Sequence, residues 1–95
     1  MIDGPRLRPA SGGAARSLVV FLHGYGAAGN DLIDIGRHWS ATLPDTAFAS
    51  PNAAEACAEA PVGRQWFGLT MRDPDELWRG VTRAAPVLDE FLDAE

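Results

Sequence analysis

The sequence feature that most restricts the fold is a short apolar run that leads straight into a glycine-rich segment. Five apolar residues, Leu18 to Leu22, are followed by His-Gly-Tyr-Gly-Ala-Ala-Gly at positions 23–29. The run is too short for a helix, and an unbroken series of Val, Leu and Phe is typical of a strand that is covered on both faces. We therefore predict a buried strand over about 17–22, as in a parallel sheet flanked by helices.

The next two segments complete a strand–helix–strand unit. Residues 30–43 carry apolar side chains at helical spacing, with capping residues before them and a proline after them. Gly36 should weaken the interior of this helix by about 1 kcal/mol. A second short strand over about 46–51 follows, which predicts a right-handed crossover and a parallel sheet. The predicted buried face of the helix consists of Leu32, Ile35, Trp39 and Leu43.

The remaining segments have less regular patterns. Residues 1–16 are rich in Gly, Pro, Arg and Ser, which predicts a loop with one short edge strand around 6–8. Residues 52–72 show no periodicity, and a loop of that length in a compact domain is usually functional or a lid. A final helix is predicted over about 74–94, kinked at Pro86. Its buried stripe should contain Leu77, Val81, Ala84, Leu88 and Leu92 or Phe91.

Length, charge and composition exclude several classes of partner. Ninety-five residues make one domain at most, and residues 1–95 are interpreted below as the N-terminal part of one domain. The net charge is −5 with the eight arginines interleaved among acids, so no nucleic acid is expected. No apolar run approaches the roughly 18 residues of a membrane span and no apolar leader is visible, which argues against stable membrane insertion. The single cysteine, Cys57, allows no internal disulfide and fits a reducing cytoplasm. No residues have metal-ligand spacing, and we expect no cofactor.

The glycines at positions 24, 26 and 29 raise the possibility of a nucleotide site. They match the G-x-G-x-x-G pattern of a dinucleotide-binding turn, directly after a strand. Such a site also needs an acidic residue at the end of the second strand, where this sequence has Ser50-Pro51-Asn52. A chain without lysine cannot carry a P-loop either. A dinucleotide-binding βαβ fragment of an oxidoreductase is therefore the alternative interpretation.

Three motifs favour a different chemistry. "FLHGYGAAGNDL" (21–32), "ASPNA" (49–53) and "GRQWF" (63–67), in this order and spacing, resemble the carboxylesterase/phospholipase family of α/β-hydrolases. The resemblance covers most of residues 17–95. It implies an α/β-hydrolase fold and serine-dependent hydrolysis of carboxylic esters, with thioesters and lysophospholipids as further candidate substrates.

The resemblance also implies roles for individual residues. Acyl transfer places negative charge on a carbonyl oxygen, and backbone N–H groups fixed in advance stabilise that charge. By its position, the Tyr25 N–H is the expected oxyanion donor, and Gly24 and Gly26 let the backbone turn, with Gly26 at positive φ. His23 should brace this loop through hydrogen bonds, because a triad histidine follows the serine in this fold. Two aromatic residues have alternative roles, as core residues or as the lining of an acyl groove: Trp66 and Phe67.

The catalytic triad is missing from the sequence. No G-x-S-x-G pattern occurs, and no acid and histidine follow one. We therefore expect an incomplete α/β-hydrolase fold that lacks the nucleophile-elbow half and is inactive alone. Its partners would be a small-molecule ester and the C-terminal remainder of the same hydrolase, as a separate chain or a missing segment. A non-catalytic module of hydrolase ancestry is a further alternative.

Overall fold

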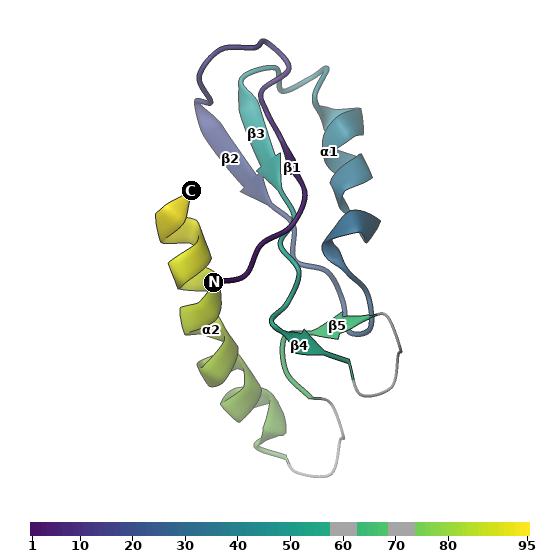
Figure 1. Cartoon of the computed structure of the whole chain (residues 1–95), viewed down its shortest axis with the longest axis vertical. Coiled ribbons are helices and arrows are strands. Elements are labelled where there is room, and N and C mark those ends of the chain that lie inside the picture. The colour runs from purple at the N-terminus through teal and green to yellow at the C-terminus, as the bar shows by residue number, and fades with distance from the viewer. Residues whose placement is uncertain (58–62, 69–73) are drawn as a thin grey trace.

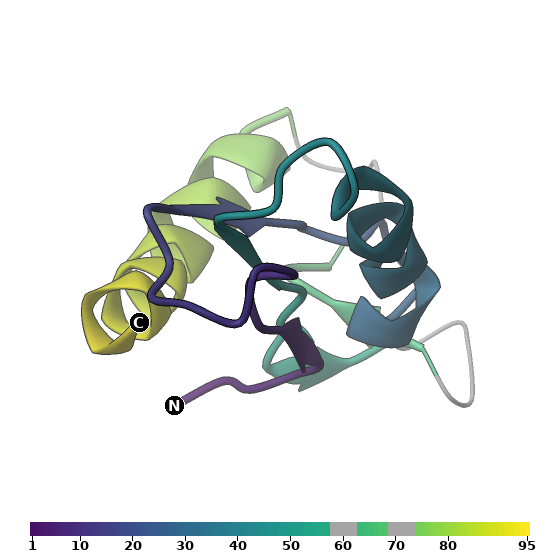
Figure 2. The ribbon, with the colours of Figure 1, turned by 90° about the horizontal axis from the view of Figure 1, so that it is seen from above.

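The protein forms a small sheet between two helices. The computed structural model describes residues 1–57, 63–68 and 74–95. Its elements are β1 (Arg6–Leu7), β2 (Ser17–Val20), the 3-10 turn η1 (Gly29–Asp31), α1 (Ile33–Trp39), β3 (Thr46–Ala49), β4 (Glu55–Ala56), β5 (Arg64–Gln65) and α2 (Glu76–Ala94). Seen from above, the strands lie between α1 and α2 (Figure 2). The β4–β5 hairpin lies beyond the C-terminal ends of β2 and β3 (Figure 1).

The three-stranded sheet is mixed, with strand order β1–β3–β2. β2 and β3 are parallel, as the strand–helix–strand pattern predicted, whereas β1 is antiparallel to β3. The antiparallel strand arises because the N-terminal segment runs back along the end of β3. The Ser50 N–H donates to the Pro5 carbonyl over 2.9 Å, and the Asn52 N–H donates to the Asp3 carbonyl over 2.9 Å. The expectation of a wholly parallel sheet is therefore corrected, and the short edge strand near residues 6–8 is confirmed.

The two parallel strands differ in burial. Phe48 of β3 is only 1% exposed, whereas Leu18 of β2 is 40% exposed and Leu22, just after it, is 50% exposed. β3 has a neighbour on each side, while β2 pairs only with β3 among the described residues. The prediction that the strand over 17–22 is covered on both faces is thus wrong for the described part of the chain.

Helix α1 presents a different face from the one predicted. Ile33 and Gly36 are its buried residues, whereas the side chains of Ile35, Trp39 and Leu43 are exposed. The helical phase changes because the segment begins as the separate turn η1, and α1 ends before Leu43. A Cβ on Gly36 would lie 2.9 Å from Phe48 Cγ, so this glycine permits close packing of α1 on the sheet.

Helix α2 buries part of the predicted stripe, with Phe91 and not Leu92 as its buried residue near the C-terminal end. Gly80 and Phe91 are buried, and Phe91 joins Ile2 and Ala49 in the core. Leu88 packs against that core as expected. Three residues of the predicted stripe are exposed instead: Leu77, Val81 and Leu92.

The helix α2 is continuous through Pro86, and the kink at that residue stays a prediction. The segment predicted to be irregular, 52–72, contains the β4–β5 hairpin; residues 58–62 and 69–72 of that segment lie outside the described residues. No helix in the described part of the chain combines the length and the apolar character required to cross a membrane.

Candidate functional site: the loop after β2

The glycine loop begins with a tight turn at the C-terminal end of β2. The Ala27 N–H donates to the Gly24 carbonyl over 3.1 Å, and Gly26 has a φ of +78°. A positive φ at the third position is the mark of a type II turn, which glycine adopts without steric cost. The expected positive φ of Gly26 is therefore confirmed.

The buried side chain of His23 holds the first peptide of this turn. Its Nε2 accepts a hydrogen bond from the Ala53 N–H over 3.0 Å, and its Nδ1 lies 2.8 Å from the Gly24 carbonyl oxygen. Because a backbone N–H can only donate, Nε2 must be the acceptor, so the ring proton of neutral His23 is on Nδ1 and points at Gly24. The Gly24 carbonyl thus accepts two hydrogen bonds, from His23 and from Ala27.

These two bonds fix the direction of the Tyr25 N–H. The Gly24 carbonyl and the Tyr25 N–H belong to the same planar trans peptide, in which the two groups point in opposite directions. Any restraint on the carbonyl therefore acts equally on the N–H. The Tyr25 side chain itself is exposed.

Trp66 and Phe67, the two aromatic residues predicted to lie in the core or in an acyl groove, are placed between this loop and α2. The Trp66 indole stacks on His23 with ring centroids 5.3 Å apart, and its Nε1–H donates to the His23 carbonyl over 3.0 Å. Phe67 packs against Gly80, where a Cβ would overlap the Phe67 ring. Both aromatic residues also line an open apolar pocket of about 270 Å³, together with Leu22, Val81, Ala84, Ala85 and Leu88.

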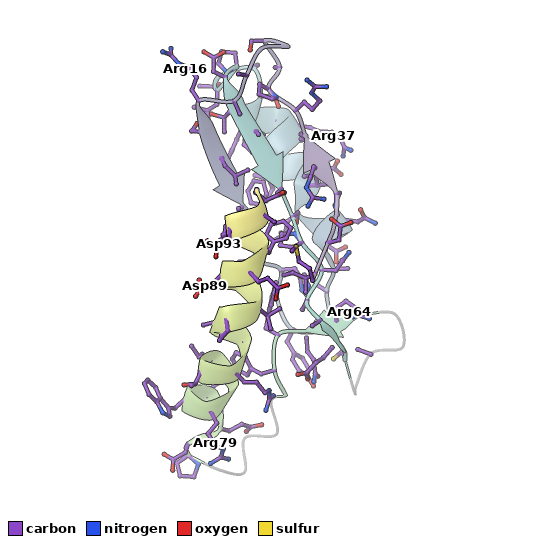
Figure 3. All side chains as sticks on the ribbon, turned by 60° about the vertical axis from the view of Figure 1, so that its left-hand side comes forward. Arg16, Arg37, Arg64, Arg79, Asp89 and Asp93 are labelled. Carbon is purple, nitrogen blue, oxygen red and sulfur yellow. The ribbon has the colours of Figure 1, made fainter. Side chains whose placement is uncertain are left out.

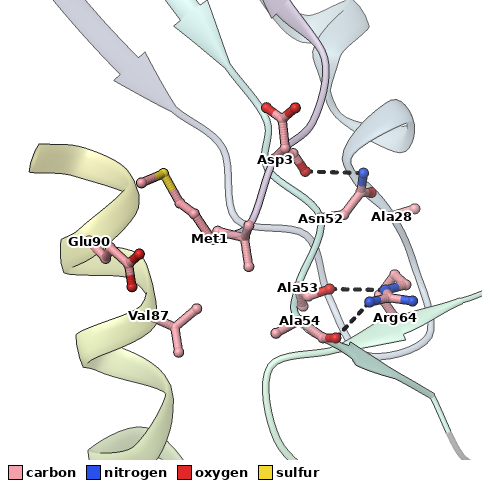
Figure 4. Close-up of a pocket in the computed structure, with 10 residues that line it drawn as sticks. Met1, Asp3, Ala28, Asn52, Ala53, Ala54, Arg64, Val87 and Glu90 are labelled. Carbon is pink, nitrogen blue, oxygen red and sulfur yellow. Dashed lines mark hydrogen bonds between the residues drawn. The ribbon is translucent and has the colours of Figure 1, made fainter. Parts of the chain in front are cut away.

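The hairpin residue Arg64 contacts the loop through both its main chain and its side chain. The Gly26 N–H donates to the Arg64 carbonyl over 2.9 Å, and the Arg64 N–H donates to the Ala27 carbonyl over 2.8 Å. The guanidinium donates to the carbonyls of Ala53 and Ala54 over 2.9 and 2.7 Å (Figure 4). Arg64 belongs to the segment "GRQWF" that carries the family resemblance, but the sequence assigned it no role, because backbone carbonyls as partners leave no pattern in the sequence.

Residues that follow β3 bind the C-terminal end of the loop at Gly29. The Gly29 N–H donates to Asn52 Oδ1, and the Ser50 hydroxyl donates to the Gly29 carbonyl, each over 2.8 Å. A Cβ on Gly29 would overlap the Ser50 carbonyl oxygen, so only glycine allows this approach. Sequence reasoning used Ser50 and Asn52 as a family signature and did not identify these contacts.

The start of η1 is poorly suited to a phosphate. The Ala28 N–H donates to Asp31 Oδ2 over 2.7 Å, so a carboxylate already binds the N–H group at the beginning of this turn. A dinucleotide phosphate would meet a negative charge where it needs backbone donors. The geometry therefore disfavours the dinucleotide interpretation.

Charge is dispersed over the molecule. Arg16, Arg64 and Arg79 lie in separate regions along its length (Figure 3). Within residues 1–57, 63–68 and 74–95, no three His, Cys, Asp or Glu side chains group closely enough to hold a metal ion. The thiol of Cys57 is buried and free.

Comparison with known proteins identifies the family. The model of the phospholipase/carboxylesterase family matches residues 9–95. The chain belongs to this family. A solved structure described as the crystal structure of esterase PE8 is 45% identical, with a TM-score of 0.91. The match covers 98% of this chain and 44% of the esterase chain, so this member of the phospholipase/carboxylesterase family spans less than half the length of that esterase. Its mixed sheet and two helices are thus part of an α/β-hydrolase fold.

Proposed function

We propose that the loop after β2 binds the oxyanion of a serine-dependent carboxylic ester hydrolase, with the Tyr25 N–H as one donor. In α/β-hydrolases one oxyanion donor follows the nucleophile and the other comes from a loop that follows a central strand. Residues 23–29 follow β2 directly; β2 is at the edge of the sheet in the described residues, and a further strand paired with it would make it central. The family match supports an ester as the substrate.

The observation that carries this proposal is the double hydrogen bond to the Gly24 carbonyl. A donor that is already oriented needs no reorganisation when charge develops on the substrate, and this preorganisation is the main source of oxyanion stabilisation. His23 and Ala27 hold the Gly24–Tyr25 peptide in one orientation through hydrogen bonds within the protein itself.

The nucleophile, its base and the supporting acid are proposed to come from polypeptide outside these 95 residues. The sequence has no nucleophile elbow, and the hydroxyl of each serine has a structural partner: Ser11 with Gly13, Ser17 with Thr46, Ser40 with Gly36 and Ser50 with Gly29. Both ring nitrogens of His23 are engaged as well. The edge of β2 that is unpaired among the described residues, beside Leu18–Leu22, is where the strand that carries the nucleophile is proposed to pair.

The apolar pocket beside the loop is proposed to contribute to the acyl groove. Trp66 connects the two, since its indole contacts His23 and also lines the pocket. Phe67 lines the same pocket from the hairpin side. Apolar lining next to the oxyanion donor suits an ester with a hydrocarbon acyl chain.

Complementation tests the proposed function. The 95-residue chain would be assayed for hydrolysis of p-nitrophenyl esters, alone and together with the part of esterase PE8 that it does not match; this pair is called the complemented enzyme below. We expect hydrolysis only from the pair, with a fluorophosphonate labelling the added polypeptide. Inhibitor-sensitive hydrolysis by the 95-residue chain alone would contradict the proposal, and micromolar binding of NAD in calorimetry would favour the dinucleotide alternative.

A further inference from the structure

We propose that Arg64 is a positioning residue for the oxyanion loop, and that its guanidinium acts through Ala53 and His23 on the Gly24–Tyr25 peptide. This inference rests on the proposed function for its catalytic consequence. The contacts that carry it connect the loop after β2 with the chain after β3 and with the β4–β5 hairpin, which follows that chain directly.

The first step is the hold of Arg64 on the chain after β3. Its Nε donates to the Ala53 carbonyl and its Nη2 to the Ala54 carbonyl, so one planar group binds two successive peptides (Figure 4). A guanidinium presents several donors in a rigid fork, whereas a lysine ammonium is a compact charge on a flexible stem. Two-point contact fixes the orientation of the backbone at residues 53–54 as well as its position.

The second step passes from Ala53 to the loop. The carbonyl of Ala53 accepts from Arg64, and the N–H of the same residue donates to His23 Nε2 over 3.0 Å. That bond selects the His23 tautomer whose Nδ1–H faces the Gly24 carbonyl. Arg64 therefore acts on the Tyr25 N–H through one backbone residue and one imidazole ring.

The main chain of the hairpin adds a second route to the same turn. The Arg64 carbonyl and N–H bond to Gly26 and Ala27, and a Cβ on the preceding residue, Gly63, would overlap the Gly26 carbonyl. These main-chain contacts remain when the side chain is changed. A substitution at Arg64 therefore isolates the route through Ala53 and His23.

Arg83 provides a matched control. Arg83 lies on α2, and its guanidinium forms an exposed ion pair with Glu55 of β4 at 3.7 Å. Exposed pairs of this kind contribute little to stability. Arg83→Met removes the same group as Arg64→Met without touching the proposed route.

The direct test is the protonation pattern of His23 in the 95-residue chain. A long-range proton–nitrogen NMR spectrum of the native protein should show one tautomer, with the proton on Nδ1. Arg64→Met should give a tautomer mixture and accelerate hydrogen exchange at the Ala53 amide at least about 10-fold, because the peptide that binds Nε2 is no longer held. Arg64→Lys should be intermediate, and Arg83→Met should match the native protein.

The kinetic test uses the complemented enzyme. Arg64→Met should lower kcat by about 10- to 100-fold and change KM little, since displacement of a group that acts on the transition state affects turnover rather than substrate binding. A folded Arg64→Met with an unchanged His23 spectrum and unchanged kcat would overturn the inference. Loss of folding in both Arg64→Met and Arg64→Lys, with Arg83→Met folded, would also overturn it by making Arg64 a general stabilising residue. A shifted His23 spectrum with no hydrolysis by the native pair would support the role of Arg64 in loop geometry and contradict the proposed function.

Discussion

Leu22 and His23 are neighbours in the sequence, but their side chains differ sharply in burial. Leu22 is 50% exposed, on the open side of β2, whereas His23 is 2% exposed and hydrogen-bonded through both ring nitrogens. The hydrogen bonds of the loop come from residues of this chain. By contrast, Leu18 and Leu22 and three residues of α2 remain exposed among the described residues: Leu77, Val81 and Leu92. The comparison indicates that the hydrogen bonds of the loop after β2 form without the neighbour that would cover the exposed apolar residues of β2 and α2.

Leu22 and His23 differ in burial because hydrogen bonds and apolar contacts need different amounts of partner surface. A hydrogen bond is satisfied by a single correctly placed partner, and the loop obtains its partners from Ala53, Arg64 and Trp66. An apolar side chain is buried only when another surface of comparable area packs against it and removes it from water. Leu18 and Leu22 therefore stay exposed although the strand itself is well formed.

The largest effect should distinguish the covered strand from the open one. Phe48→Ala removes a ring that is 1% exposed and packs against Phe21 and α1, and it should lower the free energy of unfolding of the 95-residue chain by about 3–5 kcal/mol. Leu22→Ala should lower it by less than about 1 kcal/mol, because half of the side chain is already exposed to water. Urea denaturation followed by circular dichroism measures both, and equal losses would contradict the distinction between the strands.

The next largest effect concerns the turn in the loop. Gly26→Val places a β-branched residue at a φ of +78°, which should misdirect the Tyr25 N–H and lower kcat of the complemented enzyme by about 100- to 1,000-fold. Tyr25→Phe is the control, since the proposed donor belongs to the backbone, and it should change kcat by only a few fold. The assignment fails if the phenylalanine variant loses turnover and the valine variant retains it.

A smaller effect is expected at Trp66, which contacts both regions. Trp66→Ala should reduce kcat/KM of the complemented enzyme for octanoate esters more than for acetate esters, by about 5-fold for about 40 Å² of lost apolar contact. Loss of the Trp66 contact with His23 should affect both substrates equally. This effect therefore cancels in the ratio of kcat/KM for octanoate esters to kcat/KM for acetate esters. Trp66→Phe, which keeps a ring but loses the 3.0 Å bond to the His23 carbonyl, should leave the ratio nearly unchanged. An unchanged ratio in both variants would assign Trp66 to the core alone.

The smallest effect lies at the exposed N-terminal segment. The hydrogen bond from Arg6 lowers the pKa of Asp3 from its ordinary value of 3.8. A lowered pKa in the folded state means that the carboxylate adds stability above pH 3.8 and that this contribution is lost as the pH falls further. Asp3→Asn should therefore reduce the difference in melting temperature between pH 6 and about pH 2.5. An equal acid dependence in the two proteins would show that the pair contributes nothing.

The sequence predicted those features whose residues are consecutive. Residues 18–26 carry the strand, the turn and His23 in one continuous stretch, so their pattern was readable. Arg64 could not be identified in the same way, because its partners are backbone atoms of Ala53 and Ala54, and any residue at those positions offers the same carbonyls.

Helical periodicity was less reliable for the two helices, for separate reasons. In the first, the turn η1 changes the phase, so Ile33 and Gly36 face the sheet. In α2 two adjacent apolar stripes exist, and a sequence pattern does not say which one meets the sheet. The structure assigns that contact to the stripe that contains Gly80 and Phe91. Gly36, which the sequence analysis expected only to weaken the helix, lets α1 pack closely on Phe48 of the sheet.

The contact between the first strand and the last helical turn has a consequence for how the chain folds. Arg6 donates to the Glu95 carboxylate and lies over the Phe91 ring, a contact that spans 89 residues of sequence. The pairing of β2 with β3 brings together Ser17 and Thr46, 29 residues apart, so closing the longer loop costs about 1 kcal/mol more in chain entropy. During synthesis the sheet can therefore form while Ile2 and Ala49 still await the helix that covers them. Docking of α2 is the step at which Arg6 meets Glu95, and a chaperone that recognises exposed apolar side chains can bind before that step.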